Sequence, residues 1–189
     1  IGPYLNFFIS TEEIAKHVFG KNEMKKEKET TLVESPGPNT NKPLHLGHVR
    51  NGLIGNTLIN LFRKIGHEVH HVDVINDRGI HICKSMLAYK KFGNDDTPEK
   101  SGMKPDHFVG KYYVLYAQKA EEDKNLEEEA KEMLQKWEDN DPETIDLWKK
   151  MNNWAISGML ETYEKLGLRV EKAYPESTTY KKGREIILN

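Results

Sequence analysis

The order of short elements between residues 30 and 75 restricts the fold of this chain more than any other feature. Residues 30–34 contain three β-branched side chains and predict a strand, and a proline- and asparagine-rich loop follows at residues 35–43. Apolar residues then recur at helical spacing as far as Gly66, and residues 68–75 predict a second strand. Strand, helix and strand form a βαβ unit, so the sequence predicts an α/β fold with a parallel sheet. The apolar residues with helical spacing are Leu46, Val49, Leu53, Leu58, Leu61, Phe62 and Ile65.

Helices are predicted for most of the remaining sequence. A turn at residues 76–79 leads into a helix that ends near residue 92, and residues 94–105 are expected to form a loop. Residues 106–166 predict two or three helices with a break near Pro142, because proline suits the first position of a helix. The residues expected on the buried side of the last of these helices are Trp148, Met151, Trp154, Ile156 and Leu160.

Shorter elements are predicted toward the two ends of the chain. Residues 1–9 predict a strand or connector, residues 10–20 a helix with a capping serine, and residues 21–29 a charged linker. After the helical stretch, residues 168–170 predict a further strand, and a last helix is expected from about Thr179.

These elements divide the chain into four parts. Residues 1–29 are expected to be the end of a preceding domain with a linker, and residues 30–92 the first half of the α/β domain. Residues 93–167 are predicted to be a helical insertion, after which residues 168–189 return to the α/β domain. The chain is therefore expected to be part of a longer protein.

The composition argues against several classes of protein. A formal net charge of −2 does not suit a protein that coats nucleic acid without sequence preference. The single Cys83 rules out a disulfide within the chain and fits a reducing compartment. No apolar run reaches membrane-spanning length and no signal-peptide pattern is present, so the sequence predicts a cytoplasmic protein that does not bind a membrane.

The loop before the long helix carries the residues with the clearest chemical meaning. It brings Lys42, His45 and His48 to the first helical turn, where free backbone N–H groups and the helix dipole favour phosphate. The two histidines are three residues apart and are expected to project from the same side, each with an N–H for a phosphate oxygen. Gly47 lacks a side chain, so a flat ring could approach the backbone there. An isolated His-x-x-His pair is more often two ordinary polar residues, but the strand, rigid loop and helix around this pair favour a function.

Several segments resemble class I aminoacyl-tRNA synthetases. PNTNKPLHLGHVRNGLIGNTL, at residues 38–58, resembles the His-x-Gly-His region of that class. Val33-Glu34-Ser35 and the Pro-Asn-x-x-Lys-Pro spacing are similar to arginyl-tRNA synthetases in particular. The turn Asn76-Asp77-Arg78-Gly79 and the later Tyr174-Pro175-Glu176-Ser177 resemble two further segments of that family. The resemblance spans about residues 30–189 and is specific across residues 33–92.

The sequence departs from the family in three places. The loop reads Ser35-Pro36-Gly37-Pro38-Asn39 where the family usually has Ser-Ser-Pro-Asn, so a role of the second serine hydroxyl is not carried over. Arg78 stands where the family usually has tryptophan. No segment like Lys-Met-Ser-Lys, the second signature of the family, occurs in the 189 residues. The chain is therefore expected to hold half of an active site and to be inactive by itself.

The resemblance implies a Rossmann-like (HUP-type) nucleotide-binding fold and an arginine–tRNA ligase, which acts in two steps. Arginine and ATP, with Mg²⁺ arriving as part of the substrate, give arginyl-adenylate, and the arginyl group then passes to tRNA(Arg). The attacking carboxylate is already ionised, so catalysis needs positioning and charge stabilisation rather than a protein base. No resident metal or organic cofactor is implied. The residues implied for catalysis are Lys42, His45 and His48, with Gly47 added for ATP binding; those implied for amino-acid binding are Glu34, Ser35, Asn39 and Glu176.

Three other patterns have ordinary explanations. His67, His70, His71, His81 and Cys83 lie close in sequence as zinc ligands would, yet adjacent strand residues point opposite ways and helix residues two apart diverge. The aromatic residues at 108, 112, 113 and 116 fit a helix core better than base stacking, and the Glu/Lys run at 121–136 fits a solvated face.

Two other functions stay open on the sequence alone. One is a small cofactor-making nucleotidyltransferase, which uses a similar His-x-Gly-His loop but typically lacks a long helical insertion. The other is a non-catalytic fragment that binds tRNA or a partner. Turnover by the chain alone would favour the nucleotidyltransferase, whereas weak ATP binding without turnover would favour part of a synthetase.

Overall fold

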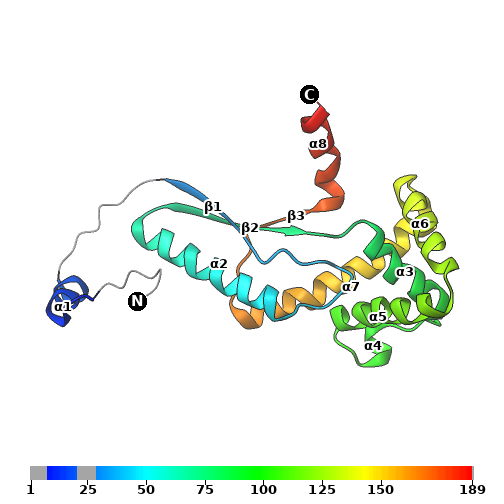
Figure 1. Cartoon of the computed structure of the whole chain (residues 1–189), viewed down its shortest axis with the longest axis horizontal. Helices are drawn as coiled ribbons and strands as arrows, with labels where there is room; N and C mark the ends of the chain where they lie inside the picture. Colours follow the sequence, from blue (N-terminus) through cyan, green and yellow to red (C-terminus); the bar gives the residue numbers. More distant parts are fainter. Residues whose placement is uncertain (1–7, 21–28, 189) are drawn as a thin grey trace, which may run out of the picture.

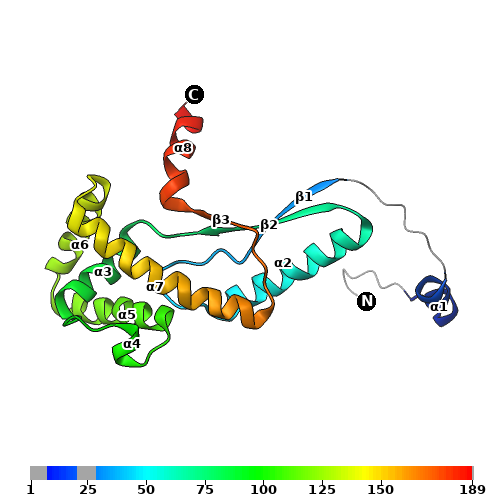
Figure 2. The same ribbon diagram turned by 180° about the vertical axis from the view of Figure 1, so that it is seen from behind.

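The computed structural model describes residues 8–20 and 29–188, so the expectations for residues 1–7 and 21–28 lie outside the described part. Helix α1 (Thr11–Phe19) is capped by Ser10, whose hydroxyl accepts from the backbone N–H of Glu13, as predicted. From residue 29 onward the chain forms a mixed α/β structure with one parallel sheet, and the long helices α2 and α7 run along one side of it (Figures 1 and 2).

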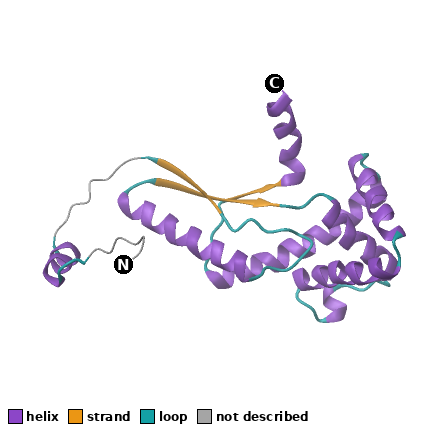
Figure 3. Ribbon diagram, viewed as in Figure 1, coloured by secondary structure: helices purple, strands orange, loops and turns teal. Residues whose placement is uncertain are grey.

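The βαβ unit predicted from the sequence is present with the predicted bounds. Strand β1 (Thr30–Glu34) pairs in parallel with β2 (Glu68–Ile75), and helix α2 (Leu46–Ile65) connects them. Gly66 ends α2 in the left-handed conformation, with φ +99°, which glycine adopts without steric cost. A third strand, β3 (Lys172–Pro175), pairs in parallel with the other edge of β2, so β2 is the centre of the sheet (Figure 3).

The predictions of a strand at residues 168–170 and of a last helix from Thr179 are both wrong by a few residues. Gly167 and Leu168 donate backbone N–H groups to Glu164 and Tyr163 and so complete the end of the preceding helix. Because this cap uses residue 168, the strand begins only at residue 172. Helix α8 (Glu176–Leu188) then follows β3 without a loop.

Helix α2 turns a glycine face toward the sheet, which the apolar spacing did not predict. A Cβ on Gly55 would lie 2.2 Å from Ser35 Oγ, and one on Gly52 would lie 2.5 Å from Leu168 Cδ1. Ile59 is buried beside these glycines. Four of the seven predicted apolar positions are instead exposed, and they are Leu46, Leu53, Leu58 and Leu61. Close backbone approach at the two glycines, together with the buried Ile59, holds α2 to its neighbours.

Most of the helical segment packs at one end of the molecule, and its last helix runs from there back along the sheet (Figure 1). It consists of α3 (Ile80–Phe92), α4 (Pro98–Ser101), α5 (Pro105–Glu122), α6 (Asn125–Glu138) and α7 (Pro142–Leu166). The short helix α4 lies where a loop was predicted, because Thr97 caps it and Pro98 occupies its first turn. Helix α3 shares one hydrophobic core with α5, α6 and α7.

The aromatic residues of α5 lie mainly in this core, as predicted. Phe108, Tyr112 and Tyr116 are buried, whereas Tyr113 contacts His81 nearer the surface. The expectation for Leu160 of α7 is wrong, because its side chain is exposed. Most of the Glu/Lys run at 121–136 faces solvent, with a few apolar residues of α6 turned inward. Among the described residues, no helix is long and apolar enough to cross a membrane.

We expect the two faces of α2 to differ sharply in their contribution to stability. Ile59 is 2% exposed, and Ile59→Ala should lower the free energy of unfolding by about 2–5 kcal/mol, as for other buried aliphatic truncations. Leu61 is 58% exposed, and Leu61→Ala should change it by less than about 0.5 kcal/mol. Urea unfolding of both variants measures the difference, and equal losses would contradict the orientation of α2.

Candidate functional site

His45 and His48 cap the first turn of α2 with side chains that accept from backbone N–H groups. His45 Nδ1 accepts from the N–H of Gly47 at 3.1 Å, and His48 Nδ1 accepts from the N–H of His45 at 3.2 Å. The two rings stack with their centroids 3.9 Å apart. A neutral imidazole that accepts at Nδ1 carries its proton at Nε2. This arrangement therefore leaves two Nε2–H donors at a helix N-terminus.

Electrostatics keep His48 neutral near pH 7. Partial burial lowers the pKa of His48, and the nearby His45 and Lys42 lower it further by disfavouring a second positive charge. Lys42 therefore supplies the positive charge at this turn, while His48 supplies a neutral donor. An anion bound here would oppose these effects and raise the pKa of His48.

The structure explains why position 47 is a glycine, which the sequence alone did not. A Cβ on Gly47 would lie 2.8 Å from Cε1 of His45, so the histidine ring fills the space of a side chain. The glycine thus permits the reciprocal cap, whether or not a ligand also approaches there.

The loop after β1 runs beside the end of β2 as an extension of the sheet. The N–H of Asn76 donates to Pro38 O at 2.9 Å, and the N–H of Thr40 donates to Asn76 O at 3.0 Å. Asn39 forms an isolated parallel bridge with Asn76. The loop therefore delivers Asn39 to the carboxyl edge of the sheet, where ligands bind in open α/β folds.

The four residues predicted to bind an amino acid fall into two groups. The side chains of Glu34 and Asn39 have no hydrogen-bond or ion-pair partner within the described residues, so both are available to a ligand. Ser35 is buried, and its hydroxyl lies 3.0 Å from His71 Nε2. Glu176 lies 3.8 Å from the guanidinium of Arg78 and so already has a cationic partner.

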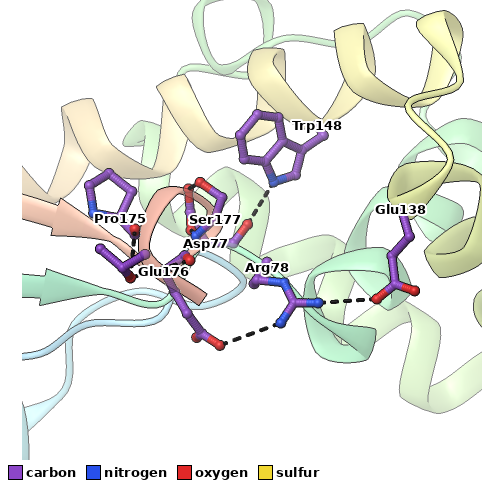
Figure 4. A network of polar contacts seen from close by, with 8 residues as sticks. Asp77, Arg78, Glu138, Trp148, Pro175, Glu176 and Ser177 are labelled. Carbon is purple, nitrogen blue, oxygen red and sulfur yellow. Dashed lines mark hydrogen bonds and ion pairs between the residues drawn. The ribbon is translucent and has the colours of Figure 1, made fainter. Parts of the chain in front are cut away.

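Asp77, in the turn after β2, fixes the start of α8 (Figure 4). Its carboxylate accepts from the N–H of Ser177 at 2.8 Å and from the Ser177 hydroxyl at 2.6 Å. Its carbonyl accepts from Trp148 Nε1 at 2.6 Å and from the side chain of Asn152. This buried acid therefore ties α7 and α8 to the same turn, and it explains why α8 begins directly after β3.

Arg78 connects the same turn to α6 and α8. Its guanidinium lies 3.8 Å from the centre of the Tyr180 ring and 5.5 Å from that of Trp137. It also pairs with Glu138 at 3.1 Å and, more distantly, with Glu176 (Figure 4). A planar cation that stacks on aromatic rings thus occupies the position where the resembling family usually has tryptophan.

The histidines that suggested zinc are separated by the strand. His71 is buried and bound to Ser35 and to Arg169 O, whereas the neighbouring His70 points outward to Glu171. Cys83 lies in the helical core, where burial raises the pKa of its thiol to about 12. Within the part of the chain that the structure describes, no group of His, Cys, Asp or Glu side chains is placed to hold a metal ion.

Sequence reasoning missed four polar residues next to the site, which are His71, Asp73, Asp77 and Tyr163. All four are buried: His71 and Asp73 bind the loop after β1, Tyr163 binds Asp73, and Asp77 binds the start of α8. A signal was present for two of them, because His71 and Asp73 lie between Val69 and Ile75 on one face of a predicted parallel strand, where apolar residues are usual.

We expect His48 to titrate below the ordinary histidine pKa when followed by NMR. His45→Ala should raise the pKa of His48, since it removes a neighbouring imidazole that disfavours protonation of His48, and Lys42→Ala should do the same to a smaller degree. A titration of His48 at or above the ordinary value in the unsubstituted protein would contradict the stacked arrangement.

Loss of the Asp77 carboxylate should loosen the start of α8. Asp77→Ala leaves two donors of Ser177 without an acceptor, so the free energy of unfolding should fall by about 1–3 kcal/mol. Ser177→Ala removes only the side-chain bond and serves as the milder matched variant. Hydrogen exchange of the first amides of α8 should quicken in Asp77→Ala, and unchanged exchange would show that another contact fixes the helix.

Comparison with known proteins gives a consistent family. The family model described as tRNA synthetases class I (R), catalytic domain, matches residues 12–188. The arginine–tRNA ligase of Borreliella afzelii is 46% identical over 100% of this chain, and that of Bacteroides thetaiotaomicron is 49% identical over 83%. These alignments cover 34% and 29% of the two relatives, so the chain spans about a third of their length.

Solved structures agree on the fold. Arginyl-tRNA synthetase from Thermus thermophilus aligns with a TM-score of 0.60 and 24% identity over 94% of this chain and 29% of its own. The enzyme from Plasmodium falciparum gives a TM-score of 0.62 and 18% identity over 88% and 28%. The three-stranded parallel sheet and its helices therefore match these catalytic domains in fold. Because the family model extends over nearly all of the sequence, the chain belongs to the family of class I arginyl-tRNA synthetase catalytic domains.

Proposed function

We propose that this chain takes part in ATP-dependent activation of arginine and its transfer to tRNA(Arg), and that it holds the His-x-Gly-His half of the active site. The observation that carries the proposal is the reciprocal cap of His45 and His48, which leaves two Nε2–H donors at the N-terminus of α2. Family membership and the names of the relatives supply the reaction.

In this proposal the two histidines and Lys42 bind and stabilise the phosphates of ATP. The substrate carboxylate attacks the α-phosphorus, and pyrophosphate leaves, so negative charge grows on phosphate oxygens rather than on a protein group. Neutral Nε2–H donors and the positive charge of Lys42 stabilise this growing negative charge, and none of them has to give up a proton. Mg²⁺ would arrive with ATP, bound mainly by phosphate oxygens and water.

Arginine would lie at the carboxyl edge of the sheet, beside Glu34 and Asn39. A guanidinium or ammonium group needs a carboxylate that no other cation occupies. Glu34 meets that condition within the described residues, whereas Glu176 is paired with Arg78. We therefore assign to Glu34 the contact with a positively charged group of arginine and to Asn39 a polar contact with arginine. Ser35 holds the loop in place through its contact with His71.

The chain alone is expected not to complete the reaction. It spans about a third of the length of its relatives and has no Lys-Met-Ser-Lys-like segment. The long helical segment and the family match speak against a small cofactor-making nucleotidyltransferase. The proposed setting is protein synthesis in the cytoplasm.

ATP–pyrophosphate exchange tests the proposal, with each of the twenty amino acids in turn and with tRNA present. The assay uses the chain itself and a chimera in which it replaces the matching segment of the Borreliella afzelii relative. Exchange by the chimera with arginine alone supports the proposal. Exchange with another amino acid would overturn the choice of arginine, and a chimera that folds but exchanges with none would overturn the activity.

Single substitutions then test the two histidine roles. His45→Ala or His48→Ala in the chimera should lower kcat by about a hundredfold to a thousandfold, as for loss of one oxyanion donor. His107→Ala is the matched control, because His107 is an exposed histidine of α5. Equal activity of all three variants would contradict the assigned roles.

A further inference from the structure

The central strand β2 turns two polar side chains toward the helix-covered side of the sheet. His71 and Asp73 are each 1% exposed, and residues two apart in a strand share a face. Strands of parallel sheets are usually apolar on both faces, so two such residues in one strand need an explanation. Neither belongs to the phosphate-binding turn of His45 and His48.

His71 binds the first residue of the loop that leads to Asn39. Its Nδ1 lies 3.0 Å from the backbone carbonyl of Arg169, an acceptor that a protonated ring nitrogen can bind. Its Nε2 lies 3.0 Å from the Ser35 hydroxyl and 3.1 Å from the Ser35 carbonyl, so the ring contacts both the side chain and the backbone of Ser35. The ring therefore joins the loop to the segment between α7 and β3.

Asp73 binds the same loop two residues later. Its Oδ1 accepts from the N–H of Gly37 at 2.9 Å, and its Oδ2 accepts from the Tyr163 hydroxyl at 2.7 Å. Gly37 has φ +72°, a conformation that favours glycine, and Glu34 Oε1 lies 3.3 Å from where a Cβ of Gly37 would be. The Asp73 carboxylate thus holds the loop at the point where it passes Glu34.

The charge on Asp73 is costly where it lies. Burial raises the pKa of Asp73, and the neighbouring Glu34 raises it further, against the hydrogen bonds from Tyr163 and Gly37 and the proximity of His71. No cation is paired with this carboxylate among the described residues. The folded state therefore keeps this proton at pH values where the unfolded state has already lost it. As the pH rises from the pKa of the unfolded state to that of the folded state, Asp73 lowers the free energy of unfolding.

We propose that His71, Asp73 and Tyr163 are positioning residues for arginine: they fix the loop from Ser35 to Asn39, and Glu34 beside it, in the geometry that binds the amino acid. This inference rests on the proposed function of the site. Asn39 and Glu34 would touch the substrate, and the three buried side chains act through them. The phosphate-binding turn is held by its own cap, so the two halves of the site depend on different contacts.

Asp73→Asn tests the inference, because asparagine keeps the size and one acceptor but loses the charge-assisted bond to Gly37. Arginine binding by the chain should weaken about tenfold or more, as expected for a lost hydrogen bond to a charged group. MgATP binding should stay within about twofold, because the cap of α2 does not involve Asp73. The Gly37 amide should exchange with solvent faster, and the unfolding midpoint at pH 7 should not fall.

Tyr163→Phe is a second variant that removes only one bond to Asp73, and it should change arginine binding in the same direction. The matched control is Asp106→Asn, which alters another buried aspartate, bound to Lys104 in the helical core. The control should lower the unfolding midpoint without changing the Gly37 amide or the ratio of arginine to MgATP affinity.

The outcomes separate this inference from the function on which it rests. Equal loss of arginine and MgATP binding in Asp73→Asn, or unchanged arginine binding, would overturn the positioning role. If the unsubstituted chain binds neither arginine nor MgATP, the function proposed for it fails. Hydrogen exchange of the Gly37 amide then still tests whether Asp73 fixes the loop. Unchanged exchange of that amide in Asp73→Asn would overturn the inference in either case.

Discussion

The pairing of β2 with a parallel strand on each side fixes the position of every residue considered for the site. β1 lies along one edge of β2 and β3 along the other, so the segments that follow all three strands meet at one edge of the sheet. The loop after β1 continues the pairing through Asn39 and Asn76, and the turn after β2 anchors α8 through Asp77. If β2 shifted by one residue, His71 and Asp73 would turn to the opposite face and both anchors of the loop would be lost.

Close contact between α2 and the first loop connects this sheet to the helix that carries His45 and His48. Gly55 allows the helix to approach until its backbone meets the Ser35 side chain, which His71 also binds. The helix and the loop are thereby held against each other, while the conformation of the first turn of α2 depends on its own cap. The outer side of α2 carries exposed leucines, so its apolar spacing does not mark the contact with the sheet.

Much of the fold could be predicted from the sequence because its signals are local. The β-branched residues of 30–34, the helical spacing that ends at Gly66 and the valines and isoleucine of 68–75 each reflect the conformation of a few neighbouring residues. Which face of α2 is buried could not be predicted, because it depends on Ser35 and Leu168, which are distant in sequence. The start of β3 was misplaced for a related reason, since the cap of α7 uses residue 168.

The candidate site was predictable in its residue types and less so in its contacts. His45 and His48 were expected on one side of a helical turn, but their stacking and reciprocal cap depend on side-chain rotamers that spacing does not specify. Glu34, Ser35 and Glu176 were all implied by the family resemblance, which does not specify what each side chain contacts. Only the three-dimensional structure shows that Ser35 faces His71 and Glu176 faces Arg78, while Glu34 has neither kind of partner in the described part of the chain.

The central claim is that the two histidines present Nε2–H donors to phosphate, and ¹⁵N NMR of their rings tests it most directly. In the free chain both rings should show the tautomer protonated at Nε2, and MgATP should shift the Nε2 signals of His45 and His48 together. Those shifts should exceed any change at His107, which lies on an exposed part of α5. Protonation at Nδ1, or saturation with MgATP that leaves both Nε2 signals unmoved, would contradict the account.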